Sequence, residues 1–424
     1  MNGPLHGLRV IEYADERGCY AGKLMADMGA EVIKVEPPQG DPTRQFEPFL
    51  DDVPGPERSL YFWHYNTNKQ SVVLDLDTDS GRDAFRALLT TADFLVESMP
   101  PGYMAERNLD EPDVRPLNGA LVYISITPFG RDMPSAHDHA TDISIMSRGG
   151  ITWMNGYDDH SLPPVRGGGN QAYHTGAHYA FMSGLVALLH RDRTGEGQHI
   201  DVSMNAAANV TNEAGSYTWL VAQDTVQRQT GRHAAVRPSM PSQVQCADGR
   251  WANTGVPPRK PAEFSRIHDW LAEAGLLDDF AEAPLLQLGA ERERIDLSRL
   301  SEDEELQAIF GAGRNAMTHI ASQLTAYEFF TGAQERGFQV GIIYSPEEVL
   351  DDPHFKERGW PVELEHPEHG RSFTYPGAPY RFEKTPWSLR KRAPYLGEDT
   401  ERVLASLGEA SAGNAASGAP STSR

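Results

Sequence analysis

Short apolar runs alternate with segments of helical periodicity in the first part of the chain. Five runs have the length and composition of buried strands: 8–13 (LRVIEY), 31–36 (EVIKVE), 71–76 (SVVLDL), 93–98 (DFLVES) and 121–126 (LVYISI). Between the first two runs, apolar residues recur at helical spacing from Ala21 to Met28, and a second helical segment begins near Asp79. The alternation predicts an α/β fold whose parallel sheet is covered by helices on both faces.

A glycine-rich loop precedes a largely apolar helical segment. Gly167, Gly168 and Gly169 lead into the sequence AYHTGAHYAFMSGLVALLHRDR. Glycines let the backbone come close to a ligand, and the junction of such a loop with a helix often carries a working side chain. Tyr173 and His174 occupy that junction. The turn after the first apolar run has no G-x-G-x-x-G motif, so a nicotinamide or flavin site would lack its usual phosphate-binding turn.

The pattern changes along the chain in a way that predicts two domains. Residues 1–222 carry the alternating strands and helices of a large domain, and 223–334 carry acidic helical segments that predict a smaller α-rich domain. Residues 335–407 return to strands and loops and are assigned to the large domain again. The tail at 408–424 is small and polar, which predicts disorder.

Composition narrows the class of protein. The 424 residues include 38 Lys and Arg against 60 Asp and Glu, a formal charge of −22, so the average field repels nucleic acid and anionic membranes. The two cysteines, Cys19 and Cys246, lack metal-ligand spacing, so no metal site is expected and a reduced compartment is favoured. With no export or membrane segment recognised, we expect a cytoplasmic protein.

Nine stretches, taken together and in order, resemble the family III CoA-transferases, the group that includes formyl-CoA transferase, carnitine CoA-transferase and 2-methylacyl-CoA racemase. These stretches are GPLHGLRVIEY, AGKLMADMGAEVIKVEPPQGDPTR, NTNKQSVVLDLDTDSGR, DFLVESMPPG, LVYISITPFG, GLVALLHRDRTGEGQHIDVSM, VQCADGRWANTG, SPEEVLDDPHFKERG and YPGAPYRFEKTP with APYLGEDTERVL. The resemblance implies a Rossmann-like large domain built from both chain ends, an inserted smaller domain, and two interlocked chains with a very large interface.

The resemblance also implies covalent catalysis. In this family an aspartate of a G-D-x-x-x-G segment attacks the acyl-CoA thioester, and an enzyme-bound aspartyl-CoA thioester follows. That aspartate precedes the histidine of the ALLHR segment by seventeen residues, which leads from His190 to Tyr173, or to Ala172 if the register shifts. No Asp or Glu occurs at 165–184. The glycine loop therefore resembles the family's loop without its nucleophile.

Three residues are the catalytic candidates. Tyr173 could act as a nucleophile with His174 as its base, but a phenol with a pKa of roughly 10 is poorly suited to that role, and a pocket wall is the alternative. Asp142 matches an acidic position of the transferases and could orient substrate, serve as a fallback carboxylate or cap a helix. Racemase activity is not expected, because Thr141 and Tyr173 occupy the positions of both racemase bases.

The resemblance suggests which residues contact CoA, which is expected as a substrate and not as a tightly bound cofactor. Lys69 keeps the family pattern and is the first choice for a phosphate or adenine contact. Arg44 and Arg166 are further candidates, together with the three glycines. Glu106 stands at a basic position of formyl-CoA transferase, and the neighbouring Arg107 could compensate for it.

Three hypotheses follow for the function. The chain is a CoA-transferase subunit whose homologous partner supplies the aspartate, because related chains can interlock as identical ones do. Alternatively, it is an active homodimer that uses Asp142 or Tyr173, or it is an acyl-CoA-binding protein without turnover. In each case the partners are an acyl-CoA, a carboxylic acid for the transferases, and a second chain, with no nucleic acid or membrane.

Overall fold

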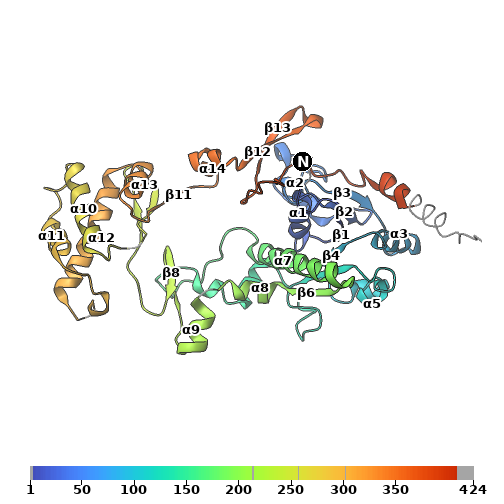
Figure 1. Ribbon diagram of the computed structural model, residues 1–424, viewed down its shortest axis with the longest axis horizontal. Coiled ribbons are helices and arrows are strands. Elements are labelled where there is room, and N and C mark those ends of the chain that lie inside the picture. The colour runs from blue at the N-terminus through green and yellow to red at the C-terminus, as the bar shows by residue number, and fades with distance from the viewer. Residues whose placement is uncertain (1–2, 213, 256, 301, 408–424) are drawn as a thin grey trace, which may run out of the picture. The chain divides into compact units, whose positions relative to one another are not determined.

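The computed structural model describes residues 3–212, 214–255, 257–300 and 302–407 (Figure 1). The chain divides into two compact units, each described by itself here. The larger unit comprises Met1–Asn155, Pro163–Val226 and Lys356–Arg424, and the smaller unit comprises Gly156–Leu162 and Gln227–Phe355. The tail expected to be disordered, 408–424, lies outside the described residues.

The larger unit is built on a six-stranded parallel sheet, which confirms the expected α/β class. Its order is β3-β2-β1-β4-β5-β6, formed by β1 (Arg9–Tyr13), β2 (Glu31–Glu36), β3 (Gln70–Val73), β4 (Phe94–Glu97), β5 (Val122–Thr127) and β6 (His199–Ser203). From β1 the chain builds outward to β3 and then returns to the other side of β1 with β4. The strand order therefore reverses between β1 and β4, where open α/β sheets bind ligands at the carboxyl ends of their strands.

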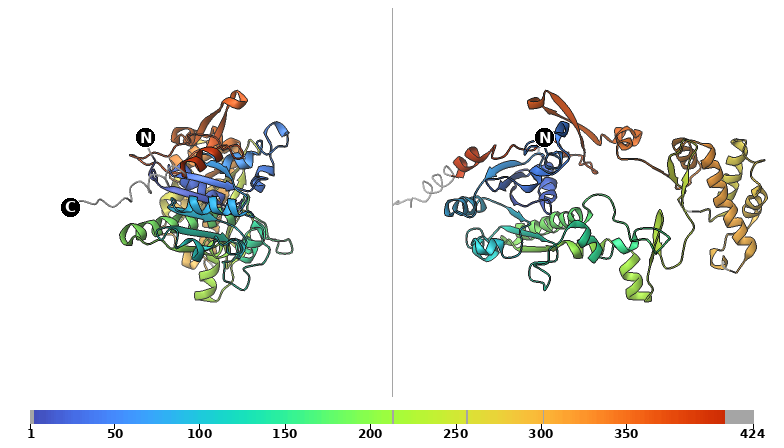
Figure 2. Two further views of the ribbon diagram at one scale, coloured as in Figure 1. Left: turned by 90° about the vertical axis from the view of Figure 1, so that its right-hand side faces the viewer. Right: turned by 180° about the vertical axis from the view of Figure 1, so that it is seen from behind.

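Helices cover both faces of this sheet (Figures 1 and 2). The helices of the larger unit are α1 (Cys19–Asp27), α2 (Leu60–Tyr65), α3 (Asp79–Leu89), α4 (Tyr103–Glu106), α5 (Glu111–Val114), α6 (Asp142–Arg148), α7 (Gln171–Thr194), α8 (Met204–Val210) and α9 (Ala214–Ala222). A hairpin follows later in the chain, formed by β12 (Pro361–His366) and β13 (Arg371–Pro376). Among the described residues, no helix has both the length and the apolar character needed to cross a bilayer.

Small residues let α7 approach the sheet closely. A Cβ added at Gly184 would lie 2.9 Å from Ile124 of β5, and one at Gly176 would lie 2.8 Å from Met204. Helices α1 and α7 share one buried core with the sheet. On the opposite face, Phe85 of α3 packs in a second core that also includes Val403 near the described end of the chain. The position of α7 fixes its N-terminus, with the glycine loop, relative to the sheet.

The smaller unit is mostly helical. Its elements are the hairpin β7 (Gln227–Gln229) and β8 (Arg232–Ala235), the antiparallel strands β9 (Gln243–Gln245), β10 (Trp251–Asn253) and β11 (Gly341–Ile343), and the helices α10 (Pro261–Glu273), α11 (Ala283–Glu291), α12 (Glu304–Gln323) and α13 (Ala326–Glu335). Helix α14 (Pro353–Arg358) lies where the chain returns to the larger unit. Phe264, Trp270, Ile309 and Phe329 lie in the core of the smaller unit.

The division between the units differs from the predicted boundaries in three places, the first of which is the continuation of the larger unit to Val226 and not to 222. The chain returns to the larger unit at Lys356 and not at 335. The reason is that β11, which follows residue 335, pairs with β10 of the smaller unit. The smaller unit also takes Gly156–Leu162 from within the predicted large domain. There, Asp158 forms an ion pair with Arg232.

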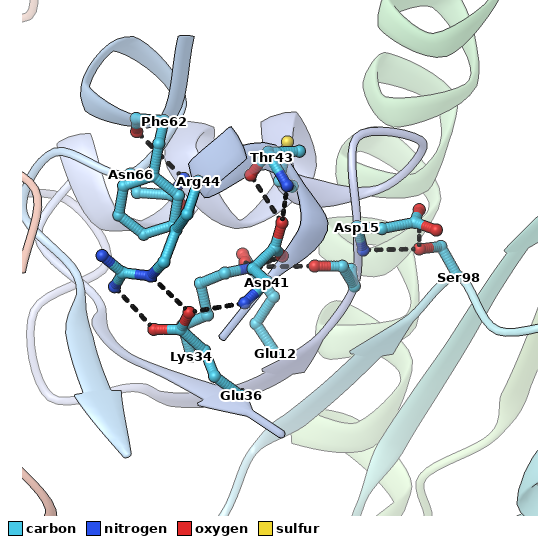
Figure 3. A network of polar contacts seen from close by, with 12 residues as sticks. Glu12, Asp15, Lys34, Glu36, Asp41, Thr43, Arg44, Phe62, Asn66 and Ser98 are labelled. Atoms are coloured by element: carbon cyan, nitrogen blue, oxygen red, sulfur yellow. Dashed lines mark hydrogen bonds and ion pairs between the residues drawn. The ribbon is translucent and has the colours of Figure 1, made fainter. Parts of the chain in front are cut away.

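A network of buried charges lies at the carboxyl ends of β1 and β2 (Figure 3). Lys34 is fully buried, and its ammonium nitrogen lies 2.6 Å from a carboxylate oxygen of Asp41 and 3.2 Å from one of Glu12. Burial opposes the charge of Lys34, but Asp41 and Glu12 outweigh it and raise its pKa. Lys69 lies on the other side of Glu12, at 2.7 Å. One carboxylate thus holds two buried lysines.

Arg44 continues this network toward the end of the chain. Its guanidinium makes two hydrogen bonds to Glu36, of 2.7 and 2.8 Å, and stacks over the ring of Phe62 (Figure 3). It also donates to the carbonyl of Pro394. Because all of Arg44 is buried, each of these contacts replaces hydration that the ion has lost. The network therefore joins two central strands to a segment more than three hundred residues later.

We expect Glu36→Gln to destabilise the protein strongly. The amide keeps the size of the side chain but leaves Arg44 buried without its full counter-charge, which costs about 3–5 kcal/mol in comparable cases. Urea denaturation should show the loss in the free energy of unfolding. The control is Asp79→Asn, because Asp79 is exposed and pairs with Arg82 at the surface, where such pairs contribute less than about 1 kcal/mol. Equal effects of the two changes would contradict this account of the network.

Candidate active site

The carboxyl ends of β1 and β4 are tied together beside a small cavity. The hydroxyl of Ser98, after β4, donates to the carboxylate of Asp15 at 2.8 Å and accepts from the Asp15 amide at 3.0 Å (Figure 3). A cavity of about 180 Å³ adjoins this contact and is lined by Tyr13, Asp41 and Met99, among others. It lies at the reversal of strand order, the position that favours ligand binding in this class of sheet.

Asp142 is fastened to the start of α7 and to the glycine loop. One carboxylate oxygen accepts a hydrogen bond from the amide of Ala172 at 2.8 Å, and the other pairs with Arg166 at 2.9 Å. The side chain is buried. With both oxygens engaged, Asp142 caps α7 and offers no free oxygen for attack on a thioester. This geometry favours the capping role among those predicted for it.

Tyr173 lies against Asp142, and the backbone of that residue engages its hydroxyl. The phenolic oxygen accepts from the backbone amide of Asp142 at 3.1 Å. Burial raises the pKa of Tyr173, and the negative charge of Glu16 raises it further. A phenol in this environment ionises less readily than one in water. The geometry therefore favours the pocket-wall role over the nucleophilic one.

His174 points to a different set of aromatic residues. Its Nε2 atom lies 2.6 Å from the hydroxyl of Tyr65, and its ring packs on Tyr20 with centroids 4.6 Å apart. Burial lowers the pKa of His174, so the imidazole is neutral near pH 7. His174 therefore contacts Tyr65 in this arrangement, and its role as the base for Tyr173 stays a prediction.

The glycine loop is exposed and is closed by Arg166. A Cβ added at Gly167 or Gly168 would meet no atom within 4 Å, whereas Gly169 has a φ of +75°, which other residues rarely adopt. Arg166 donates to the carbonyl of Gly169 at 2.6 Å and to the side chain of Asn170. Asp142, Tyr173, Arg166 and the loop thus lie together, and their predicted roles in catalysis and CoA binding stay predictions.

The other predicted CoA contacts have partners inside the protein. Lys69 has no exposed surface, and its ammonium group contacts Glu12, the carbonyl of Cys19 and the side chain of Asn66. Arg44 is equally buried in its contacts with Glu36. Neither cation can reach a phosphate in this arrangement, because both are committed to the ionic network. Both residues therefore have a structural role beside the site.

Arg107, another basic candidate, is partly exposed. It pairs with Asp77 at 2.6 Å and lies over the ring of Tyr103, 3.7 Å from its centroid. The hydroxyl of Tyr103 in turn contacts that of Tyr13, which lines the cavity. Because Asp77 is largely exposed, an incoming phosphate could compete for Arg107. The predicted CoA contact at Arg107 remains a prediction.

Glu16 is a carboxylate that the sequence analysis missed. It lies between β1 and α1, half-buried, and its pKa is raised by burial and then by neighbouring Asp15. Its negative charge raises the pKa values of both Tyr61 and Tyr173, where burial is the larger cause. The charge of Glu16 therefore raises the pKa of Tyr173, the residue that the family resemblance aligns with the aspartate. In the sequence, the feature that could have identified Glu16 is its position in the turn that follows the first predicted strand.

One group of possible metal ligands occurs elsewhere in the larger unit. Among the described residues, His366, Glu368 and His369 have ligand atoms within 4.8 Å of one another. Glu368 pairs with Arg392 at 3.1 Å, and Nε2 of His366 lies 3.0 Å from the hydroxyl of Tyr375. These partners account for the positions of Glu368 and His366 through protein contacts alone.

Glu97, at the end of β4, makes the stability of the sheet depend on pH. It is 2% exposed and accepts a hydrogen bond from the amide of Met99 at 2.7 Å. Burial raises its pKa to about 7, although Ser125, Met99 and Arg131 act in the opposite direction. The folded protein therefore binds a proton here more tightly than the unfolded chain does. The stability that this proton contributes is complete below about pH 4.5 and is lost as the pH rises to about 7.

We expect Glu97→Gln to remove this dependence, because the amide keeps the acceptor oxygen without the charge. Relative to the wild type, the variant should gain on the order of 2–3 kcal/mol in the free energy of unfolding at pH 8 compared with pH 5. Urea titrations at both pH values measure this gain. Parallel pH profiles of the two proteins would show that Glu97 has an ordinary pKa.

Comparison with known proteins gives a consistent result. The model of the family described as CoA-transferase family III matches residues 5–400. The chain is 32% identical to succinyl-CoA:(R)-benzylsuccinate CoA-transferase subunit BbsE of Thauera aromatica, over 94% of this chain and 93% of that protein. It is 30% identical to succinate–glutarate CoA-transferase of Agrobacterium fabrum, over 95% and 96% of the two chains. A CAIB/BAIF family protein from Brucella suis has a similar structure, with a TM-score of 0.77, 27% identity and coverage of 96% of this chain and 100% of that one.

Proposed function

The chain belongs to CoA-transferase family III, and from that premise we propose that it works as one subunit of a hetero-oligomer that moves CoA from an acyl-CoA to a free carboxylic acid. A homologous partner supplies the aspartate nucleophile, and the two chains interlock. The observation that carries this proposal is the chemistry of the glycine loop. It has no carboxylate at 165–184, and Asp142 is held by Ala172 and Arg166.

The transfer itself proceeds in steps that the family resemblance implies. An aspartate carboxylate attacks the thioester carbonyl, the C–S bond breaks, and CoA leaves as a thiolate. The thiolate attacks the aspartyl carbonyl of the mixed anhydride, which releases the donor acid and leaves an aspartyl-CoA thioester. The acceptor carboxylate then repeats the exchange in reverse and regenerates the aspartate. Tyr173 can perform none of these steps as a carboxylate does, because an aryl ester is not an anhydride.

Two observations support a subunit role. The relative from Thauera aromatica is named as a subunit of its CoA-transferase. In this chain the start of α7, where the nucleophile would be expected, is filled by Tyr173 and closed by the Asp142–Arg166 ion pair. Such a site can support the fold of an interlocked assembly without performing chemistry of its own.

The position of Glu16 favours a second candidate, an active chain with a different nucleophile. The carboxylate lies close enough to Tyr173 for its charge to raise the phenol's pKa. Burial raises the pKa of Glu16 itself, and a less solvated carboxylate is a stronger nucleophile once it is ionised. In this case the purified chain would form an acyl or CoA adduct on Glu16. Mass analysis of the adduct separates the two candidates.

We expect the purified wild-type chain to keep its mass when it is mixed with succinyl-CoA. Tyr173→Asp should gain a trace of hydroxylamine-sensitive CoA adduct at residue 173, because it restores the required group and removes bulk. Only a trace is expected, since Asp142 opposes a second nearby charge and an offset of about 1 Å costs on the order of a hundredfold in rate. Intact-mass spectrometry with peptide mapping provides the measurement.

Tyr173→Phe is the matched control, because it removes the hydroxyl without adding a carboxylate and should form no adduct. A wild-type adduct that maps to Glu16 and disappears in Glu16→Gln would replace the subunit proposal with the second candidate. A wild-type adduct on Asp142 or Tyr173 would equally refute it. If no variant forms an adduct, the expectation for Tyr173→Asp is wrong.

We also expect the chain to be at least dimeric and to stay so on dilution, since interlocked chains separate only when they unfold. Sedimentation velocity from micromolar to nanomolar protein measures this.

When the chain is purified from its native source, mass identification should find a homologous subunit with an intact G-D loop. A well-folded monomer would contradict the interlocked assembly, and a pure homo-oligomer would contradict the hetero-oligomer.

A further inference from the structure

The smaller unit contains a large pocket of its own. It has a volume of about 950 Å³, and every residue that lines it belongs to that unit. Its lining comes from β8, from the loop that follows β8, from the middle of α12 and from the segment before β11. Ligand pockets in proteins commonly have volumes of about 300–1,000 Å³, so this one can hold a molecule the size of a metabolite.

The pocket is basic although the protein is acidic. Arg232, His233, Arg259 and Arg314 line it, and none of the described residues that line it is an Asp or Glu. The whole chain carries a formal charge of −22. A local concentration of positive charge in such a protein attracts small anions against the average field.

Arg232 is held in place by its own partners. Its two Nη atoms pair with the carboxylate of Asp158 at 2.7 and 3.0 Å, and its Nε atom donates to Gln229 and Ser239. This bidentate pair fixes the guanidinium at the wall of the pocket. Arg232 therefore provides a rigid positive wall whose charge is already largely balanced.

Arg314 differs, because its charge is not balanced. Its Nε atom donates to the carbonyl of Pro241 at 3.1 Å, and within the described residues its two Nη atoms make no hydrogen bond or ion pair. The side chain is half-buried, and both burial and the positive charge of Arg232 lower its pKa. A bound anion would remove this cost, since a guanidinium offers two parallel donors to a carboxylate or phosphate.

The rest of the lining mixes apolar and uncharged polar side chains. Met240, Pro241, Leu300 and Phe310 line the pocket together with the basic residues. Arg259 is exposed at the same pocket, and no contact within the described residues holds its side chain. The lining thus suits a ligand with two parts, an anionic group and an apolar body.

We propose that this pocket binds an organic anion, a carboxylate or phosphate monoester on an apolar body, with Arg314 as the main ligand for the anionic group. Arg259 adds a second, mobile cation, and Phe310 and Met240 contact the apolar body. The site lies wholly within the smaller unit and does not depend on the proposed function.

Three probes of similar apolar size test the proposal: 4-phenylbutyrate, 4-phenylbutyl phosphate and the neutral 4-phenyl-1-butanol. Hydrogen–deuterium exchange on the full chain should slow at 232–242 and 310–317 with one or both anions and not with the alcohol. Calorimetric titration should show that Arg314→Gln weakens anion binding by roughly tenfold or more, as expected when a charge-assisted contact is lost. The anion that protects identifies the site as one for carboxylates, for phosphate esters or for both.

Two further variants keep the result interpretable. Arg294→Gln is the matched control, because Arg294 is an exposed arginine of the same unit that lies outside the pocket, and binding should not change. Arg259→Gln alters a side chain without structural contacts, so it should weaken binding even if Arg314→Gln fails to fold. Protection by none of the probes, equal protection by the alcohol, or binding that survives both pocket variants would overturn the proposal.

Discussion

The sharing of Glu12 between two fully buried lysines is the constraint on which the larger unit depends. Lys34 comes from β2 and Lys69 immediately precedes β3; Lys34 is also paired with Asp41, whereas Glu12 is the carboxylate that pairs with Lys69. Arg44 extends the same requirement to Glu36 and to the chain near Pro394. Because no member can lose its partner cheaply, the carboxyl edge of the sheet forms as a whole.

In the candidate site, the residues that stabilise the sheet differ from those that lie at the start of α7. The basic residues that the family pattern singled out, Lys69 and Arg44, hold the strands that shape the crevice. The groups at the start of α7 are likewise engaged, with Asp142 bonded to Ala172 and Arg166. Among the carboxylates around Tyr173, Glu16 is set apart by a pKa that burial raises. Under the proposed function, the phenol of Tyr173 stands where the family's aspartate would act.

Much of the fold could be predicted, because periodicity records burial directly. The strands β1 to β5 coincide with the five apolar runs to within a residue or two at most ends, whereas the order of the strands in the sheet was not predicted. The network could not be predicted, since a sequence does not reveal that Lys69 faces Glu12 across 57 residues. The return at Lys356 was hidden for the same reason. It depends on the pairing of β11 with β10, two strands of three residues each.

The detour of Gly156–Leu162 into the smaller unit bears on how this protein could be recombined. Arg232 obtains its counter-charge from Asp158, which is encoded some seventy residues earlier and outside the continuous stretch Gln227–Phe355. Exchange of that stretch alone between relatives would separate the two partners and leave an arginine at the pocket without its carboxylate. Shuffling of the smaller unit as a module therefore requires the exchange of two separate segments, so the two are constrained to be inherited together.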